Sequence, residues 1–427
     1  MFVAFARALL ACTFLLCSLG AGAQTPEAEP IDPTGELTLA RAIDAALRGN
    51  PDLQASAYEL SAAQARRIQV GLRPNPELNL ELENFAGSGA VAGTDALETT
   101  LSLSQVVELG GKRALRRSIA DAGVDFVTIE QRARELDLLA EVTRRFIDLV
   151  AAQERARFSA ESTDLAQKTL NAIGARVDAA RSPEAERSRA RIALTRAQVE
   201  QRHAESERRS ARYALSALWG NPEPGFTAAR AEIFNLRAVQ SFHALMERLE
   251  QSPDFVLFAS ERRLREAELR LAQAQARPNL AFSLGVRRFE ENNDTALVAG
   301  FSVGLPVYDR NQGAIREAQV RVTQSDALLA AARVRARAML LSLYQEMDAD
   351  RIRVETLRSE ALPQAQLALD QTRSGYDRGR FSFLELITAQ EELLALGAAS
   401  IDAAAEYHRL LAEIERLTSA ALTRPSP

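Results

Sequence analysis

The residue types that most often carry out chemistry are few and scattered in this chain. Its three histidines, His203, His243 and His408, lie far apart and none stands four residues from another. No His-Glu-x-x-His zinc motif or Gly-x-Ser-x-Gly elbow is therefore formed, and Gly110-Gly111-Lys112 lacks the spacing of a phosphate-binding loop. We interpret each histidine as a helix-surface residue. The sequence predicts a protein that is not an enzyme and has no cofactor or metal ligands.

Two other sequence features, a polar run and a lone tryptophan, are better explained by structure than by binding. The run Glu290-Glu291-Asn292-Asn293-Asp294 offers oxygen ligands that could hold a cation weakly, but its composition favours a solvated loop. Trp219 stands beside the breaker-rich segment 220–225, and we interpret it as a packing residue at a helix end.

The N-terminus is typical of an export signal. Arg7 precedes an apolar run over 8–19, and Ala21 and Ala23 place small residues before a cut after position 23. Residues 1–23 are predicted to be a signal peptide, too short to span a membrane. Both cysteines lie inside it, so the mature chain has no thiol for a disulfide or a metal. A lipoprotein cleavage site before Cys12 remains an alternative.

Composition narrows the class of protein further. The chain has 427 residues, with 52 Lys+Arg against 57 Asp+Glu and a net charge of -5. That balance argues against a nucleic-acid surface, which needs clustered positive charge. Glycine and proline are scarce, which predicts a mainly helical fold.

The sequence is predicted to be a duplication with an offset near 200 residues. Segment 50–53 (Asn-Pro-Asp-Leu) corresponds to 252–255 (Ser-Pro-Asp-Phe), and Arg-Pro-Asn recurs at 73–75 and 277–279. The predicted repeats are 24–225 and 226–427, with the seam around 221–231. Each begins with a helical stretch, 39–72 or 236–276, that ends at the Arg-Pro-Asn.

The elements that follow have the same order in both predicted repeats. Apolar and polar residues alternate within 77–106 and 280–305, which predicts two strand pairs with hairpin loops at 86–95 and 290–294. Long helices are predicted over 112–177 and 313–375, the second interrupted only by Pro363. A helix of about 60 residues spans roughly 90–100 Å. Return helices over 183–218 and 382–422 are predicted to form coiled-coil hairpins with the long helices.

The strand count predicts an oligomer if the strands cross a membrane. Four strands cannot close around a lumen without leaving unpaired backbone groups in lipid, whereas three copies supply about twelve. The predicted fold is mainly α with a small transmembrane β-barrel. It is a trimeric 12-stranded barrel, four strands per chain, continued by a long α-helical coiled-coil periplasmic tunnel. The alternative is a soluble sheet packed on helices.

Two junctions carry a resemblance. Val107-Glu108-Leu109-Gly110-Gly111-Lys112-Arg113 and Leu305-Pro306-Val307-Tyr308-Asp309-Arg310-Asn311-Gln312-Gly313 resemble the strand-to-helix turns of the outer membrane efflux protein family, the TolC-like outer membrane factors. They look most like the CzcC-type heavy-metal branch. The junction residues are Gly110, Gly111, Pro306 and Gly313, whose glycines are expected to permit the turn. Lys112 and Arg113 are expected either near lipid headgroups or at a solvated helix start.

The resemblance also implies where the tunnel closes. The closed end corresponds to 177–186 and 376–385, and the gate candidates are Glu385, Glu186, Tyr376 and Asp377. Three copies of Glu385 would form a ring that attracts cations. A second acid of the family is Thr388 here, which puts a double ring in doubt. The alternative is that Glu385 is a solvated coiled-coil charge.

The resemblance implies the outer-membrane channel of a tripartite RND-type efflux system. It would be a homotrimer in the outer membrane of a Gram-negative bacterium, in contact with outer-membrane lipid, a periplasmic adaptor and an inner-membrane pump. The implied cargo is heavy-metal cations such as cobalt, zinc or cadmium. Alternatives are drug efflux, type I secretion, or a periplasmic adaptor protein. The duplication and the two strand pairs argue against the adaptor, which needs one hairpin and no barrel.

Overall fold

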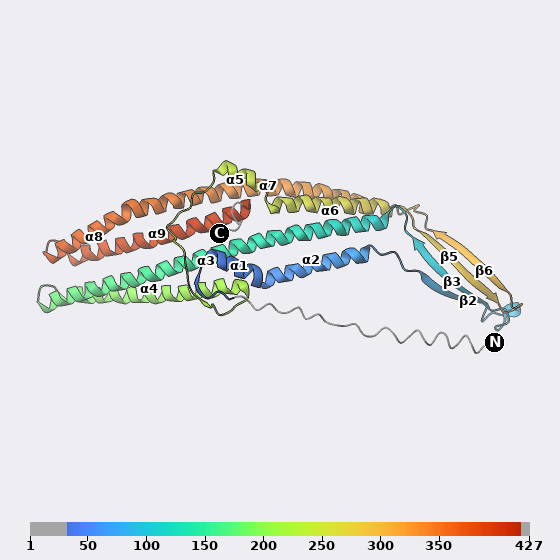
Figure 1. Ribbon diagram of the computed structural model, residues 1–427, viewed down its shortest axis with the longest axis horizontal. Coiled ribbons are helices and arrows are strands. Elements are labelled where there is room, and N and C mark those ends of the chain that lie inside the picture. The colour runs from blue at the N-terminus through green and yellow to red at the C-terminus, as the bar shows by residue number, and fades with distance from the viewer. Residues whose placement is uncertain (1–31, 420–427) are drawn as a thin grey trace.

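The computed structural model describes residues 32–419. The predicted signal peptide and the alternative lipidation site at Cys12 lie outside the described residues. The described chain is elongated, with long helices over most of its length and a sheet at one end (Figure 1).

Both halves of the chain contain the same order of helices around a strand pair. The helices of the first half are α1 (Leu39–Gly49), α2 (Pro51–Val70), α3 (Lys112–Asp178) and α4 (Glu184–Ser216), the last extended by a short 3-10 turn (Ala217–Trp219). Those of the second half are α5 (Phe242–Leu249), α6 (Pro253–Gln275), α7 (Gln312–Thr356), α8 (Leu362–Asp377) and α9 (Phe383–Thr418). The helix α3 packs on α2, α4, α6 and α9, so it forms the central contact between the halves.

The first helical stretch of each half is divided, so the prediction of single stretches over 39–72 and 236–276 was wrong. Proline is the first residue of α2 and of α6, a position where its missing N–H costs no hydrogen bond. The residue before each proline stands at the N-cap position, and in the first half its side chain makes the capping hydrogen bond. The Asn50 side chain accepts from the Leu53 amide at 2.8 Å and donates to the Leu218 carbonyl at 2.8 Å.

The two long helices differ. The helix α3 runs unbroken for 67 residues, which corresponds to roughly 100 Å. In the second half a π-helical turn (Leu357–Ala361) separates α7 from α8, directly before Pro363. Proline lacks an N–H and clashes with the carbonyl four residues before it, and a wider turn relieves both problems. The predicted interruption at Pro363 is thus present, and it begins several residues earlier.

The four predicted strands form one antiparallel sheet. They are β2 (Glu77–Glu83), β3 (Glu98–Val107), β5 (Leu280–Phe289) and β6 (Thr295–Val303), in the order β2-β3-β5-β6. A 3-10 turn (Gly89–Val91) lies in the first hairpin loop. The central pair β3–β5 joins the two halves, and its register places Leu101 opposite Val286.

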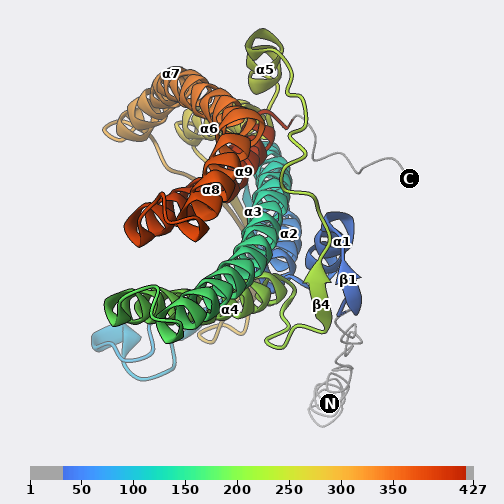
Figure 2. The same ribbon diagram turned by 90° about the vertical axis from the view of Figure 1, so that its left-hand side faces the viewer.

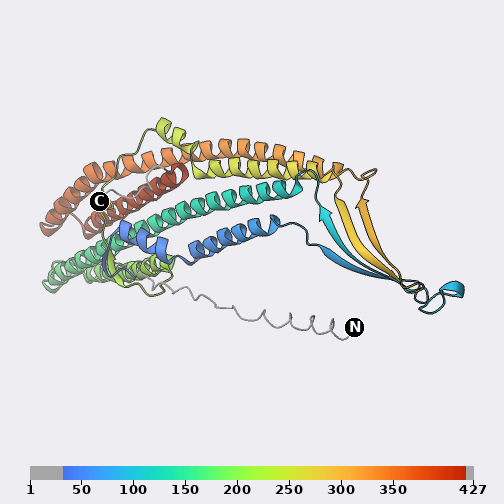
Figure 3. The same ribbon diagram turned by 45° about the vertical axis from the view of Figure 1, so that its right-hand side comes forward.

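The apolar face of this sheet is open to the outside of the chain. Leu80, Leu101, Val286 and Leu297 follow one another across the four strands, and Leu297 is 82% exposed. Figure 3 shows the strands extending beyond the helices rather than lying against them. The alternative of a sheet packed on helices was therefore wrong.

A small parallel pair near the middle of the molecule was not predicted. Strand β1 (Gly35–Leu37) pairs with β4 (Phe226–Ala229), which lies inside the predicted seam (Figure 2). Leu37, Phe226 and Trp219 are fully or almost fully buried in one hydrophobic cluster there. The Trp219 indole donates to Asp32 Oδ1 at 3.4 Å, so its predicted role as a packing residue at a helix end is confirmed.

The strand-to-helix junctions use different residues in the two halves. Gly110 and Gly111 have φ of +77° and +71°, as the predicted turn requires. In the second half Asn311 takes the left-handed conformation, with φ +58°, while Gly313 lies inside α7. The prediction that Gly313 supplies the permissive backbone was wrong, because asparagine also tolerates this conformation. Pro306 lies in the segment between β6 and α7.

Lys112 is not solvated. Its side chain is buried, and Nζ donates to the Arg277 carbonyl and to Asn279 Oδ1, both at 2.6 Å. Arg113 Nε donates to the Gly71 carbonyl at 2.5 Å. The prediction of a solvated residue was wrong for Lys112, because its ammonium instead satisfies a carbonyl at a helix end that would otherwise lack a partner. The alternative of a location near lipid headgroups stays a prediction.

Candidate functional site at the hairpin tips

The α3–α4 and α8–α9 turns lie together at the end of the molecule opposite the sheet (Figure 1). The first turn spans 179–183 and contains Ala180, which has φ +57°. The second spans 378–382, where Gly379 has φ +73°. The two hairpins therefore present their tips side by side, as the predicted closed end requires.

Tyr376 joins the two hairpins. It lies at the end of α8, is 5% exposed, and donates its hydroxyl hydrogen to Glu186 Oε2 at 2.7 Å. Its oxygen also lies 3.3 Å from Ser182 Oγ. Burial, together with the carboxylate of Glu186, raises the pKa of Tyr376 above its ordinary value of 10.0. The hydroxyl therefore remains a donor at physiological pH.

Arg176 strengthens this contact from α3. Its guanidinium carbon lies 4.5 Å from the centroid of the Tyr376 ring, and Nη1 donates to the Asp377 carbonyl at 3.3 Å. The Asp377 side chain itself is exposed. Of the predicted gate residues, the structure brings together Tyr376 and Glu186 and uses only the backbone of Asp377. Reasoning from sequence missed Arg176, whose partners lie about 200 residues away.

Glu385 has a separate, local role. Ser382 and Glu385 form a capping box at the start of α9. Glu385 Oε2 accepts from the Ser382 amide at 2.6 Å and from its hydroxyl at 2.7 Å. These hydrogen bonds, the amide first, lower the pKa of Glu385 below its ordinary value of 4.5. The carboxylate is exposed and ionised, and it does not touch the Tyr376 contact. The spacing Ser-x-x-Glu was a signal in the sequence for this cap.

Gly375 permits the close packing of the α8–α9 turn. A Cβ at this position would lie 2.0 Å from Cδ2 of Phe381, so any side chain here would force Phe381 to move. Behind the turn, Tyr376 packs against Phe383 with ring centroids 6.4 Å apart, and Leu386 and Ile173 belong to the same buried cluster. The tip is therefore an ordered unit rather than a loose loop.

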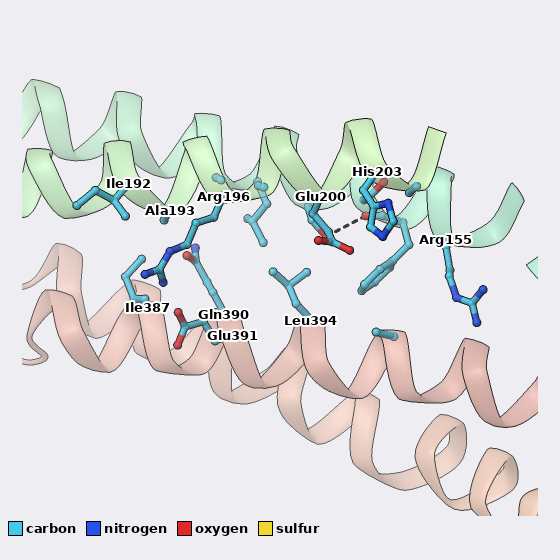
Figure 4. A pocket seen from close by; sticks show the side chains of 18 of the residues that line it. Arg155, Ile192, Ala193, Arg196, Glu200, His203, Ile387, Gln390, Glu391 and Leu394 are labelled. Atoms are coloured by element: carbon cyan, nitrogen blue, oxygen red, sulfur yellow. Dashed lines mark hydrogen bonds between the residues drawn. The ribbon is translucent and has the colours of Figure 1, made fainter. Parts of the chain in front are cut away.

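A groove of about 1040 Å³ extends from the tip between α3, α4 and α9 (Figure 4). Ile192, Arg196, Glu200 and His203 of α4 line one side of it, and Ile387 and Leu394 of α9 line the opposite side. Below it, Gln390 Nε2 donates to Thr169 Oγ1 at 2.9 Å in a buried contact between α9 and α3. This hydrogen bond holds the two hairpins together away from the tip.

The histidines do not form a site. His203 and His243 are exposed on helices as predicted, with glutamates one turn further on. The prediction was wrong for His408, which is half-buried and has Nε2 2.9 Å from the Ile233 carbonyl. Burial lowers its pKa below 6.5. Within residues 32–419, no three His, Cys, Asp or Glu side chains are placed to hold a metal ion. Nor is any helix in that range both long and apolar enough to cross a membrane.

The arrangement matches a known protein family. The sequence profile described as "Outer membrane efflux protein" matches residues 42–221 and 244–420. The chain belongs to the outer membrane efflux protein family. The predicted family is thereby confirmed, together with its architecture of long helical hairpins joined to a strand region.

Individual relatives extend the match. The cobalt-zinc-cadmium resistance protein CzcC of Cupriavidus metallidurans is 28% identical over 96% of this chain and 97% of its own. The nickel-cobalt-cadmium resistance protein NccC of Alcaligenes xylosoxydans xylosoxydans is 24% identical over 76% and 72%. The solved outer-membrane channel OprN has a TM-score of 0.74 at 18% identity and covers 90% of each chain. This outer membrane efflux protein thus has the fold of a solved channel and resembles resistance proteins for divalent metals.

Proposed function

We propose that the protein is the outer-membrane channel of a tripartite efflux system and a passive exit duct for heavy-metal cations. The observation that carries the proposal is the open four-stranded sheet at the end of helices about 100 Å long. Its apolar face is exposed, and a globular protein would gain nothing from leaving such a face uncovered. The duplicated order of elements supplies two hairpins and two strand pairs per chain.

The sheet supports a trimer. The outer edges of β2 and β6 have no partner strand among the described residues. Inside a membrane, the backbone N–H and C=O groups at these edges need hydrogen-bond partners, because lipid offers none. Joining the β6 edge of one copy to the β2 edge of the next would provide them. Three copies would close a barrel of about twelve strands, within the range of outer-membrane proteins. The apolar face would then contact outer-membrane lipid.

The helices support the same contact between copies. The helix α2 directly precedes β2, and α7 follows β6, so these helices lie at the same two edges as the strands. Both have large apolar side chains in solvent: Tyr58 and Ile68 on α2 are 72% and 71% exposed, and Val320 and Val334 on α7 are 60% and 71% exposed. Packing α2 of one copy on α7 of the next would bury them and extend the barrel into a helical tunnel.

The tips would close this tunnel. The Tyr376–Glu186 hydrogen bond holds the two hairpins of one chain together, and an opening motion that separates them must break it. Glu385 is exposed and ionised beside it, and three copies would place three carboxylates around the entrance. A periplasmic adaptor and an inner-membrane RND pump would deliver the cargo to this end and supply the energy.

The cargo is inferred from the relatives. CzcC and NccC are named for resistance to cobalt, zinc, cadmium and nickel, and CzcC aligns over nearly the whole chain. The groups of His, Cys, Asp and Glu needed for tight metal binding are not assembled in residues 32–419. A duct works with weak sites, because ions must leave as readily as they enter.

The experiment has two parts. A deletion strain is tested for growth inhibition by cobalt, zinc, cadmium, nickel, copper and silver and by several drugs and detergents, with the intact chain restored as control. Sensitivity confined to metals supports the proposal, and sensitivity to drugs alone overturns the cargo. Fractionation with unheated gels tests the channel itself. A heat-sensitive trimer in the outer membrane is expected, and a soluble periplasmic monomer would refute the channel.

A further inference from the structure

The polar face of the sheet has a strong charge imbalance. Residues alternate between the faces, so the strand register places Glu77, Glu81 and Glu83 of β2, Glu98 of β3 and Arg287 of β5 on the face opposite the leucines. Four carboxylates thus stand against one guanidinium. In a closed barrel with its leucines in lipid, this face would line the lumen.

The single guanidinium is fully engaged. Arg287 Nε donates to Thr100 Oγ1 at 2.7 Å and Nη1 to Glu98 Oε2 at 2.8 Å. Its Nη2 lies 2.8 Å from Glu83 Oε2. Glu98 also accepts from Asn84 Nδ2 at 3.3 Å through its other oxygen. All three nitrogens of Arg287, which lies on β5 in the second half, therefore have partners on β2 and β3 of the first half.

This arrangement occupies a place that a cation would otherwise take. Two carboxylates and a hydroxyl converge on the guanidinium, and oxygen ligands of this kind can hold divalent cations. The cluster is only partly exposed, with side-chain exposures of 27% for Arg287 and 25% for Glu98. The cluster lies at the hairpin end of the strands, beside the loop 290–294, which is the outer mouth of a barrel.

We propose that Arg287 sets the ion selectivity of the outer mouth by acting as a fixed internal cation. It pairs with Glu83 and Glu98 and neutralises part of their charge, so passing divalent ions are not trapped between them, while Glu77 and Glu81 still make the lumen attractive to cations. No ion pair involves these two within the described chain. The inference rests on the proposed channel and names the residues that tune its cation passage.

The neighbouring Arg288 offers a matched control. It is next in sequence and equally charged, but lies on the opposite face and binds Glu290 and Asn293 at the rim. Removing its charge alters the total charge of the chain as much as removing that of Arg287. Only Arg287 is placed to act on ions in the lumen.

The test is single-channel recording of purified trimers in planar bilayers, with KCl gradients and with added CdCl2. Arg287→Gln is expected to raise the ratio of potassium to chloride permeability roughly two- to tenfold, the effect of removing one nearby charge per chain. It is also expected to introduce block by Cd²⁺ at about 1 mM, typical of a weak oxygen site. Arg287→Lys, which keeps the charge, is expected to restore wild-type selectivity, and Arg288→Gln to match wild type.

The outcomes separate the inference from the proposed function. If Arg287→Gln conducts but shows wild-type selectivity and no Cd²⁺ block, the inference is wrong and the channel stands. If Arg287→Gln yields no trimers, the double variant Glu83→Gln, Glu98→Gln decides. It must lower the ratio of potassium to chloride permeability, and an unchanged ratio overturns the inference. A wild-type protein that forms no channels refutes the proposed function and the inference with it.

Discussion

Tyr376→Phe tests whether the tip contact holds the tunnel closed. The substitution removes one oxygen and keeps the ring, which remains packed against Phe383 and beneath Arg176. The lost hydrogen bond to Glu186 is 2.7 Å long and charge-assisted, which is worth about 1.5–3 kcal/mol. Glu186 is only partly buried, so water replaces part of this interaction and the lower end of the range is expected.

The effect on the ratio of open to closed tips is larger in a trimer, because the free-energy losses of the three chains add. A loss of about 1.4 kcal/mol per chain is tenfold in the ratio of open to closed tips. If three chains open together, the ratio shifts roughly a thousandfold toward open. The remaining contacts, such as Gln390–Thr169, limit how far the hairpins separate.

Single-channel recording measures this shift. We expect Tyr376→Phe to conduct more, or to open more often, than wild type. The control is Tyr213→Phe on α4, because Tyr213 is 52% exposed and its hydroxyl makes no hydrogen bond with the described residues. A double-mutant cycle with Glu186→Gln isolates the pair. Equal conductance of Tyr376→Phe, Tyr213→Phe and wild type, with trimers intact, would refute the reasoning.

Three further predictions concern the tip and the middle of the molecule. Glu385→Ala should raise conductance or weaken cation selectivity, and Glu385→Gln, which can still cap α9, should do the same if the charge matters. Because the pKa of Glu385 is lowered, the wild-type channel should keep its cation selectivity below pH 4.5. Unchanged conductance and unchanged cation block in both variants would count against a carboxylate ring. Gly375→Ala should destabilise the α8–α9 turn by roughly 1–3 kcal/mol, which is measured as faster amide hydrogen exchange in the turn. A second substitution, Phe381→Ala, should reverse this effect because it removes the side chain that the new Cβ meets. Unaltered exchange in Gly375→Ala would contradict the steric argument. The pKa of His408 is lowered in the folded chain, so protonation of His408 favours the unfolded chain and thermal stability should fall as the pH drops below 6.5. His408→Gln should remove that part of the pH dependence. Identical profiles of thermal stability against pH in both proteins would exclude this role of His408.

Much of the fold was predictable because its signals are local. The alternation over 77–106 and 280–305 places successive side chains on opposite faces of a strand, and the observed strands lie inside these ranges except that β3 ends one residue later, at Val107. The helix α3 begins at its predicted first residue and ends one residue beyond its predicted last one, because helix-breaking residues cluster at both of its ends. The divisions before Pro51 and Pro253 had local signals too, an Asn or Ser cap followed by proline, and these were overlooked.

The candidate site was predictable only in part. Tyr376 and Glu186 came from the resemblance to the family, and they prove to be hydrogen-bonded across 190 residues of sequence. The capping role of Glu385 was visible in the sequence spacing, whereas the burial of Lys112 was not. A lysine that follows two glycines is expected to be solvated. Its burial could not be foreseen because its hydrogen-bond acceptors lie 165 and 167 residues further along the chain.

By itself the sequence determined the long helices, the four strands of the larger sheet, their order in each half, and the family to which the chain belongs. These follow from periodicity, breakers and motifs that act over a few residues. Only the tertiary structure decided that β3 pairs with β5, that β1 pairs with β4, and that Arg287 is held by Glu83 and Glu98. Such contacts join residues far apart in sequence, and they are selected by mutual packing and charge, which no local pattern encodes.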